Sequence, residues 1–140
     1  MANKGIYIAP TNLSPEVNFA PEHNILSIKG TSAPEDVRAL YYPVIEWLRS
    51  FVSDIIDGGN KKFDENNPLR FEADLHYFNS SSAKFLYDIF MELKKLSHAG
   101  IPVKVSWYYD VEDLDQKEAG EDMALMAEME FSYIPVESEA

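Results

Sequence analysis

The stretch LRFEADLHY, residues 69–77, alternates apolar and polar side chains with a period of two over nine positions. This alternation predicts a β-strand with one face against a core. The chain then passes through Asn79-Ser80-Ser81-Ser82, and the apolar spacing changes to three and four at Phe85, Leu86, Ile89, Phe90, Leu93 and Leu96. The centre of the chain is therefore predicted to be a strand that leads into a helix, with Gly100 as the end of that helix.

Upstream, two apolar runs around Val17 and Ile25 flank the turn residues 21–24 and predict a β-hairpin that ends at Gly30. The segment Ser32-Ala33-Pro34-Glu35 has the form of a capping box, which predicts a helix start. Because Pro43 cannot donate a helical hydrogen bond, we expect one helix to end near Tyr41 and a second to run from Pro43 to Gly58-Gly59. Residues 60–68 are predicted to be a mobile surface loop.

Downstream, Val103, Val105 and Trp107 predict another strand. A weakly amphipathic helix is expected from Leu114 to Met129, and a short terminal strand from Phe131 to Val136. The order of elements predicts an α/β fold, a single domain with a mixed β-sheet of about five strands and helices packed on it. A chain of 140 residues, 46% of them hydrophobic, suits one domain over residues 1–140.

The charge is concentrated at one end of the chain. The net charge is −12, and the segment from Asp110 to Ala140 holds 11 acidic residues against the single base Lys117. Such a field repels nucleic acid and anionic membranes and favours a basic protein partner, although a solvated helix face with a charged tail explains it as well. No apolar run is long enough to span a membrane, and there is no cysteine. We expect a cytoplasmic protein.

The serines after residue 78 lie where a helix is predicted to begin. The first N–H groups of a helix lack partners and carry partial positive charge, so a phosphoryl group would be stabilised there. A plain structural reading is also open, in which one serine is a helix cap and its neighbours fill the turn.

Several separated motifs resemble the SiaC-type regulatory phosphoproteins of bacteria. They are ILSIKG (residues 25–30), YYPVIEWL (41–48), HYFNSSSAK (76–84), VSWYY (105–109) and GED (120–122). The resemblance covers about residues 13–131. It implies a single STAS-like domain with its core at about residues 13–135, because that family resembles the anti-sigma-factor antagonists in fold.

The resemblance also implies a non-enzymatic switch without a cofactor. Members are phosphorylated on a hydroxyl residue by a serine/threonine kinase of the histidine-kinase-like ATPase type, and a PP2C-like phosphatase removes the phosphate. The unmodified protein is implied to bind and activate a diguanylate cyclase, which controls cyclic-di-GMP and biofilm formation. Family members usually carry threonine directly after the asparagine of the third motif, where this chain has Ser80, and Ser81 is the rival position.

The expected partner-binding surface surrounds this serine. It comprises Tyr77, Phe78, Asn79, Ser81, Ser82, Lys84 and Tyr108. A phosphate on Ser80 would oppose docking, since a dianion is far more costly to bury than a hydroxyl.

Three other interpretations are weighed against the switch. A hydrolase built from Asp74, His76 and Ser80 lacks the Gly-x-Ser-x-Gly elbow that exposes a nucleophile. A metal site from Asp74, His76, Asp110, Glu112 and Asp113 is weak without cysteines, and ion pairs with Arg70 or Lys104 suit these side chains better. An interaction module without covalent regulation would use aromatic residues outside the core, such as Tyr42 and Tyr108, with Trp47 and Trp107 inside it.

Overall fold

The computed structural model describes residues 4–59 and 62–137. Its elements, in chain order, are β1 (Ile6–Ile8), β2 (Glu16–Ala20), a 3-10 turn (Pro21–His23), β3 (Ile25–Ser32), α1 (Val37–Gly58), β4 (Leu69–Phe78), α2 (Ser80–His98), β5 (Val103–Asp110), α3 (Leu114–Ala127) and β6 (Phe131–Val136).

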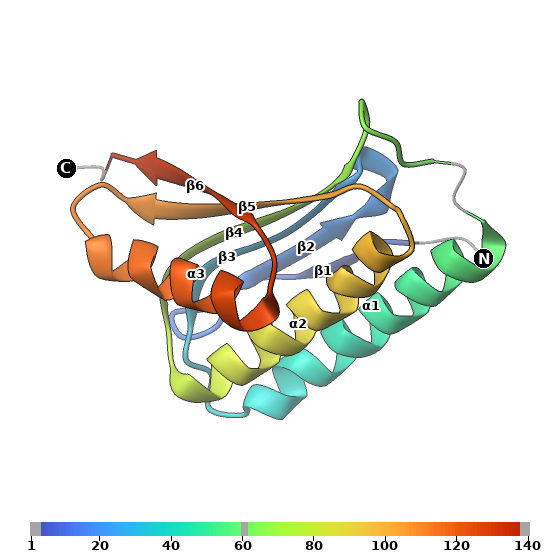
Figure 1. The fold of residues 1–140 in the computed structure, drawn as a ribbon. Coiled ribbons are helices and arrows are strands. Elements are labelled where there is room, and N and C mark those ends of the chain that lie inside the picture. The colour runs from blue at the N-terminus through green and yellow to red at the C-terminus, as the bar shows by residue number, and fades with distance from the viewer. Residues whose placement is uncertain (1–3, 60–61, 138–140) are drawn as a thin grey trace.

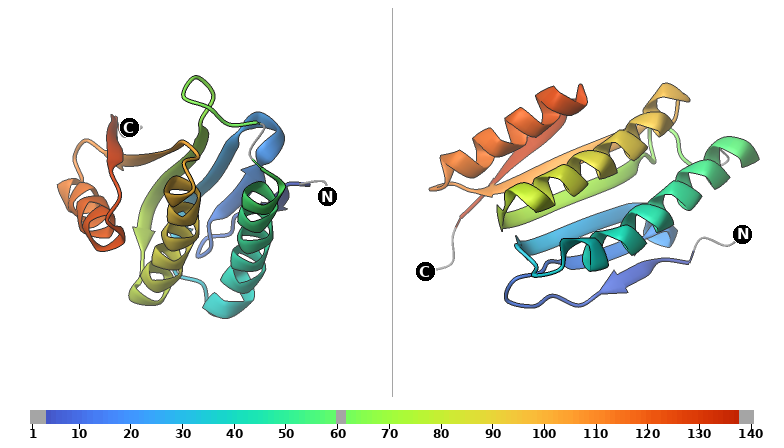
Figure 2. Two further views of the ribbon diagram at one scale, coloured as in Figure 1. Left: turned by 45° about the vertical axis from the view of Figure 1, so that its right-hand side comes forward. Right: turned by 90° about the horizontal axis from the view of Figure 1, so that it is seen from below.

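The six strands form one mixed sheet in the order β1-β2-β3-β4-β5-β6. The β1–β2 and β2–β3 pairs are antiparallel, whereas β3, β4, β5 and β6 run parallel to one another. From β3 to β6, each new parallel strand joins the sheet at the same edge. Because the crossover connections between such strands are right-handed, every connecting helix then lies on the same face of the sheet. Figures 1 and 2 show α1, α2 and α3 together on one face of the sheet, with the other face uncovered by helices.

The alternation of residues 69–77 matches this one-sided packing over most of its length. Leu69, Phe71, Ala73 and Leu75 are at most 2% exposed and face the helices. The polar residues between them lie on the uncovered face, which can remain in contact with water. The predicted α/β class and mixed sheet are confirmed.

A β-bulge at His76 ends the alternation one residue earlier than expected. Gly30 pairs with Leu75, but Thr31 pairs with Tyr77, so His76 is an extra residue in β4. Because of the extra residue, the side chains beyond the bulge point to the opposite faces of the sheet from those that strict alternation predicts. Tyr77 is therefore 54% exposed, and Phe78 packs edge-on against the Trp107 ring at 5.9 Å.

Two expectations about the first helix are wrong. Helix α1 is continuous through Pro43, because the buried residues on both sides of the proline hold one helix against the sheet. Its cap is Asp36, whose carboxylate accepts the Ala39 N–H at 3.1 Å. Ser32 is not the cap, since it is the last residue of β3 and is fully buried.

Most of the remaining elements lie where the sequence predicts them. The hairpin, α3 and the terminal strand lie where they were expected, and β1 is a sixth strand that was not predicted. Trp107 is 1% exposed, as expected for a core residue, whereas Trp47 is partly buried at the edge of the core.

In the predicted loop, Phe63 is buried, while Asn60 and Lys61 lie outside the described residues. Among the described residues, none of the helices is both long and apolar enough to span a membrane.

Candidate functional site

The start of helix α2 is capped by Asn79, the residue before the serines. Its side-chain Oδ1 accepts the Ser82 N–H at 2.9 Å, and its backbone oxygen accepts the Ala83 N–H at 2.9 Å. The Ser80 and Ser81 N–H groups have no acceptor among the described residues. Two unpaired donors at the positive end of a helix of 19 residues make this turn a favourable place for an anion.

The three serines differ in accessibility. Ser80 and Ser81 are exposed, so both residues are accessible from solvent. Ser82 is fully buried, and its hydroxyl donates to the backbone oxygen of Ser32 at 2.9 Å. The expectation that Ser82 contacts a partner is therefore wrong, because its side chain is inside the domain.

A buried hydroxyl network lies directly beneath this turn. Ser32 Oγ lies 2.7 Å from Ser82 Oγ and 2.6 Å from Tyr41 Oη. Burial raises the pKa of the Tyr41 phenol above its ordinary value, while its hydrogen bonds with Ser32 and Ser82 partly oppose that shift. The network joins β3, α1 and α2, and it fixes the position of the turn that carries Ser80 and Ser81.

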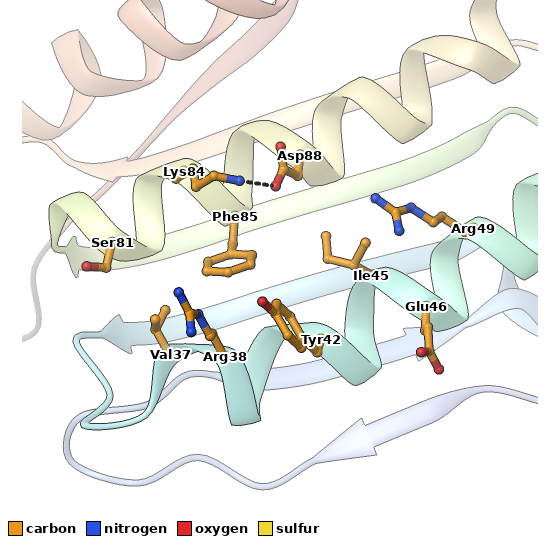
Figure 3. A pocket seen from close by; sticks show the side chains of 10 residues that line it. All are labelled: Val37, Arg38, Tyr42, Ile45, Glu46, Arg49, Ser81, Lys84, Phe85 and Asp88. Atoms are coloured by element: carbon orange, nitrogen blue, oxygen red, sulfur yellow. Dashed lines mark hydrogen bonds and ion pairs between the residues drawn. The ribbon is translucent and has the colours of Figure 1, made fainter.

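A groove of about 580 Å³ opens beside Ser81, between α1 and α2. Figure 3 shows Arg38 and Tyr42 of α1 on one side and Ser81, Lys84 and Phe85 of α2 on the other. Lys84 forms an ion pair with Asp88 at 2.9 Å and lies 5.2 Å from the centre of the Phe85 ring. Arg38 has no ion pair among the described residues. Its guanidinium is therefore available to an anion at this groove.

The structure brings together most of the predicted partner-binding residues. Tyr77 and Lys84 are exposed next to Ser80 and Ser81, and Phe78 and Asn79 are half-buried in the same turn. Tyr108 lies elsewhere, because it follows the buried Trp107 in β5 and its side chain is therefore on the opposite, uncovered face of the sheet. There its hydroxyl donates to Glu72 Oε2 at 3.5 Å. Its pKa is raised by burial and by Glu72 and Asp74.

Sequence reasoning missed Arg38. The residue precedes the apolar helical pattern, and nothing in its neighbours indicates that it lies across a groove from Ser81. Contacts between α1 and α2 place it there, and such contacts depend on the packed fold rather than on local spacing. Tyr42, which was expected to be available for contact, lines the same groove and is 54% exposed.

Within the part of the chain that the structure describes, the geometry does not assemble a catalytic or metal site, although Asp74, His76, Asp110, Glu112 and Asp113 line one pocket. His76 is exposed in the bulge, and no hydrogen bond joins it to Asp74 or Ser80 among the described residues. Residues 4–59 and 62–137 contain no group of acidic and histidine side chains that could hold a metal ion. The expected ion pairs of this strand face with Arg70 or Lys104 are also absent from these ranges.

Comparison with known proteins adds independent findings. A family model described as "SiaC family regulatory phosphoprotein" matches residues 8–136. An uncharacterized protein of Pseudomonas aeruginosa is 30% identical over 105 residues, which are 75% of each chain.

Solved structures agree with this match. The crystal structure of apo-SiaC from Pseudomonas aeruginosa superposes with a TM-score of 0.79 at 27% identity, over 94% of this chain and 98% of that one. A chain in the crystal structure of the diguanylate cyclase SiaD in complex with its activator SiaC, from the same organism, gives a TM-score of 0.81 at 27% identity, over 94% of this chain and 99% of that one.

Proposed function

The chain belongs to the SiaC family of regulatory phosphoproteins. We propose that it is a non-enzymatic switch controlled by phosphorylation of Ser80, with Ser81 as the rival position. The observation that carries the proposal is the exposed Ser80 hydroxyl at a capped helix start with two unpaired N–H groups. Ser80 has the sequence position of the family's hydroxyl residue, directly after the capping Asn79.

The proposed modifying enzymes are a serine/threonine kinase of the histidine-kinase-like ATPase type and a PP2C-like phosphatase. The proposed target is a diguanylate cyclase, which the unmodified protein binds and activates in the cytoplasm, with control of cyclic-di-GMP and biofilm formation as the outcome. The complex of the similar SiaC with the cyclase SiaD supports a cyclase as the class of target.

The mechanism is an added charge at a docking surface. Unmodified Ser80 lies among Tyr77, Phe78 and Lys84, a surface of aromatic and aliphatic groups that a partner can cover. A phosphate adds a charge of about −1.5 to −2, which is costly to desolvate in such an interface. The unpaired N–H groups of the turn would stabilise that phosphate on the free protein, which further disfavours the complex. Arg38, across the groove from Ser81, would add to this effect for a phosphate on the rival Ser81.

The test compares Ser80→Asp and Ser80→Ala in binding the organism's own diguanylate cyclase, measured by isothermal titration calorimetry. We expect Ser80→Ala to bind like the unmodified protein and Ser80→Asp to bind at least about tenfold more weakly. Ser50→Asp, at an exposed serine on α1, is the matched control and should bind normally. Equal affinities of the two Ser80 variants would refute the switch at this residue.

The modified residue is identified by peptide mass spectrometry of protein phosphorylated by its kinase. Loss of phosphorylation in the Ser80→Ala variant would support Ser80 as the modified residue. Phosphorylation that is retained in Ser80→Ala but lost in Ser81→Ala would assign Ser81 instead.

A second candidate is a protein-binding module without covalent regulation. It is favoured by the exposure of Tyr42, which lines the α1–α2 groove, and of Tyr77 near the end of β4, since each is 54% exposed. Absence of phosphate on residues 80–82 under all growth conditions in the native host would favour this module over the switch.

A further inference from the structure

A second groove lies at the far edge of the sheet, between the end of α3 and the start of β6. Its volume is about 580 Å³. It is lined by Glu121, Ala124, Leu125, Glu128, Met129, Glu130, Phe131 and Tyr133. Apolar side chains and three glutamates therefore share one concave surface.

Helix α3 presents apolar side chains to solvent at this groove. Leu125 lines the groove and is 78% exposed, and its neighbour Met126, outside the lining, is 60% exposed, while the buried side of the helix uses Met123, Ala124 and Ala127. Figure 1 shows α3 and β6 at the edge of the fold, with α2 as the neighbouring helix on the inner side. Exposed apolar groups beside a groove are typical of a surface that binds another protein.

The charge around the groove has one sign. None of the lining residues is basic, and the nearby Lys94 is already engaged by the Ala127 oxygen at 3.0 Å and Glu128 Oε1 at 3.1 Å. The end of α3 adds the partial negative charge of a helix C-terminus. Glu121 and Tyr133 both line the groove, and burial and then the Glu121 carboxylate raise the pKa of Tyr133. Basic groups on a ligand would complement this surface.

We propose that this groove binds a basic amphipathic helix of a partner protein. Leu125 in the last turn of α3 and Met129 just beyond the end of that helix both line the groove, and they offer apolar contacts to the apolar side of such a helix. Glu121 and Glu130 would pair with its lysines or arginines. A helix suits the site better than an added strand, because Pro135 removes one N–H from the exposed edge of β6. A second copy of this chain is disfavoured by its own net charge of −12.

The groove is separate from the Ser80 surface. In the sheet register, Phe131 of the groove pairs with Val105, and Val105 pairs with Phe71 near the start of β4. Ser80, in contrast, follows the end of β4. The separation along the strands is about 20 Å. The proposal therefore does not depend on phosphorylation and extends the contact area beyond the switch.

The test is an NMR titration of the full chain with a synthetic peptide of about 18 residues, in which leucine and lysine are spaced to form an amphipathic helix. We expect shifts confined to residues 121–133, with an affinity that falls as salt rises from about 0.1 to 0.5 M. Leu125→Lys should weaken binding about tenfold or more, and Leu13→Lys, at a leucine that is 49% exposed elsewhere, should not.

Other outcomes would overturn the proposal. Shifts that map outside residues 121–133, equal binding by Leu125→Lys and wild type, or equal binding of a leucine–glutamate peptide would each do so. Sedimentation velocity tests the competing occupant: a wild-type dimer that Leu125→Lys dissociates would show that the groove holds a second copy instead.

Discussion

The buried hydroxyl of Ser82 connects α2 to β3 through the backbone oxygen and side chain of Ser32. Ser82→Ala would leave these buried groups with fewer partners. We expect a loss of about 1–2 kcal/mol in the free energy of unfolding, measured by urea denaturation. Ser81→Ala is the matched control, because the exposed neighbour should change stability by less than about 0.5 kcal/mol. Equal stability of the two variants would contradict a structural role for the Ser82 hydroxyl.

Tyr41 gives the protein an alkaline sensitivity that follows from its burial. Its pKa is raised in the folded state, so above the ordinary tyrosine value of about 10 the unfolded chain loses this proton while the folded chain retains it. Stability conferred by the protonated phenol is therefore complete below that value and is lost as pH rises through the raised folded-state pKa. Urea denaturation between about pH 8 and 11 should show this decline in wild type and a shallower one in Tyr41→Phe. An unchanged slope in the variant would show that other groups cause the decline.

At the scale of elements, Gly120 sets how closely α3 approaches the sheet. A Cβ at this position would lie 2.5 Å from Trp107 Nε1. That buried N–H donates a hydrogen bond to the Gln116 backbone oxygen at 3.0 Å. Gly120→Ala should therefore cost about 2–3 kcal/mol in chemical denaturation and alter the tryptophan fluorescence. Gly58→Ala is the control, since its added Cβ meets nothing within 4 Å. A neutral Gly120→Ala would mean that α3 can move away from Trp107 at little cost.

Pro43 interrupts the hydrogen bonding of α1 but not the helix. The residue is exposed, so Pro43→Ala would remove little packing and would restore an N–H donor inside the helix. We expect stabilisation by about 1–2 kcal/mol, because the gain in helix propensity exceeds the entropy returned to the unfolded chain. Thermal denaturation measures the effect. A loss of stability would indicate that the packing of α1 depends on the local geometry of the proline.

These elements show which features local sequence can predict. The alternation of residues 69–75 and the three- and four-residue spacing after Ser82 depend on neighbours along the chain, and both predictions are confirmed. The continuity of α1 and the bulge at His76 depend on contacts with other elements, so local rules placed a break at Pro43 and extended the alternation of β4 through Tyr77. The turn that carries Ser80 was also predictable, because it lies where the period-two pattern of the strand gives way to the helical spacing along the chain. Arg38 and the groove at α3 required the packed fold.

At the scale of the whole molecule, the one-sided arrangement of helices creates two separate surfaces. The turn with Ser80 lies beyond the end of β4, whereas the groove of Leu125 lies near the start of β6. The first is proposed to change its charge on phosphorylation, and the second keeps a constant negative charge. A partner that uses both would be recruited by the groove and released by the phosphate.

If one partner uses both surfaces, their contributions to binding should be additive. Ser80→Asp, Leu125→Lys and the double variant form a cycle, measured as affinities for the diguanylate cyclase by calorimetry. Sites about 20 Å apart with no shared contacts should couple by less than about 0.5 kcal/mol, so the double variant should show the sum of the two losses. High salt should reduce the effect of Leu125→Lys, because the groove attracts basic groups partly through exposed carboxylates. A coupling above about 1 kcal/mol would mean that the two surfaces communicate through α2 and α3, which pack against each other.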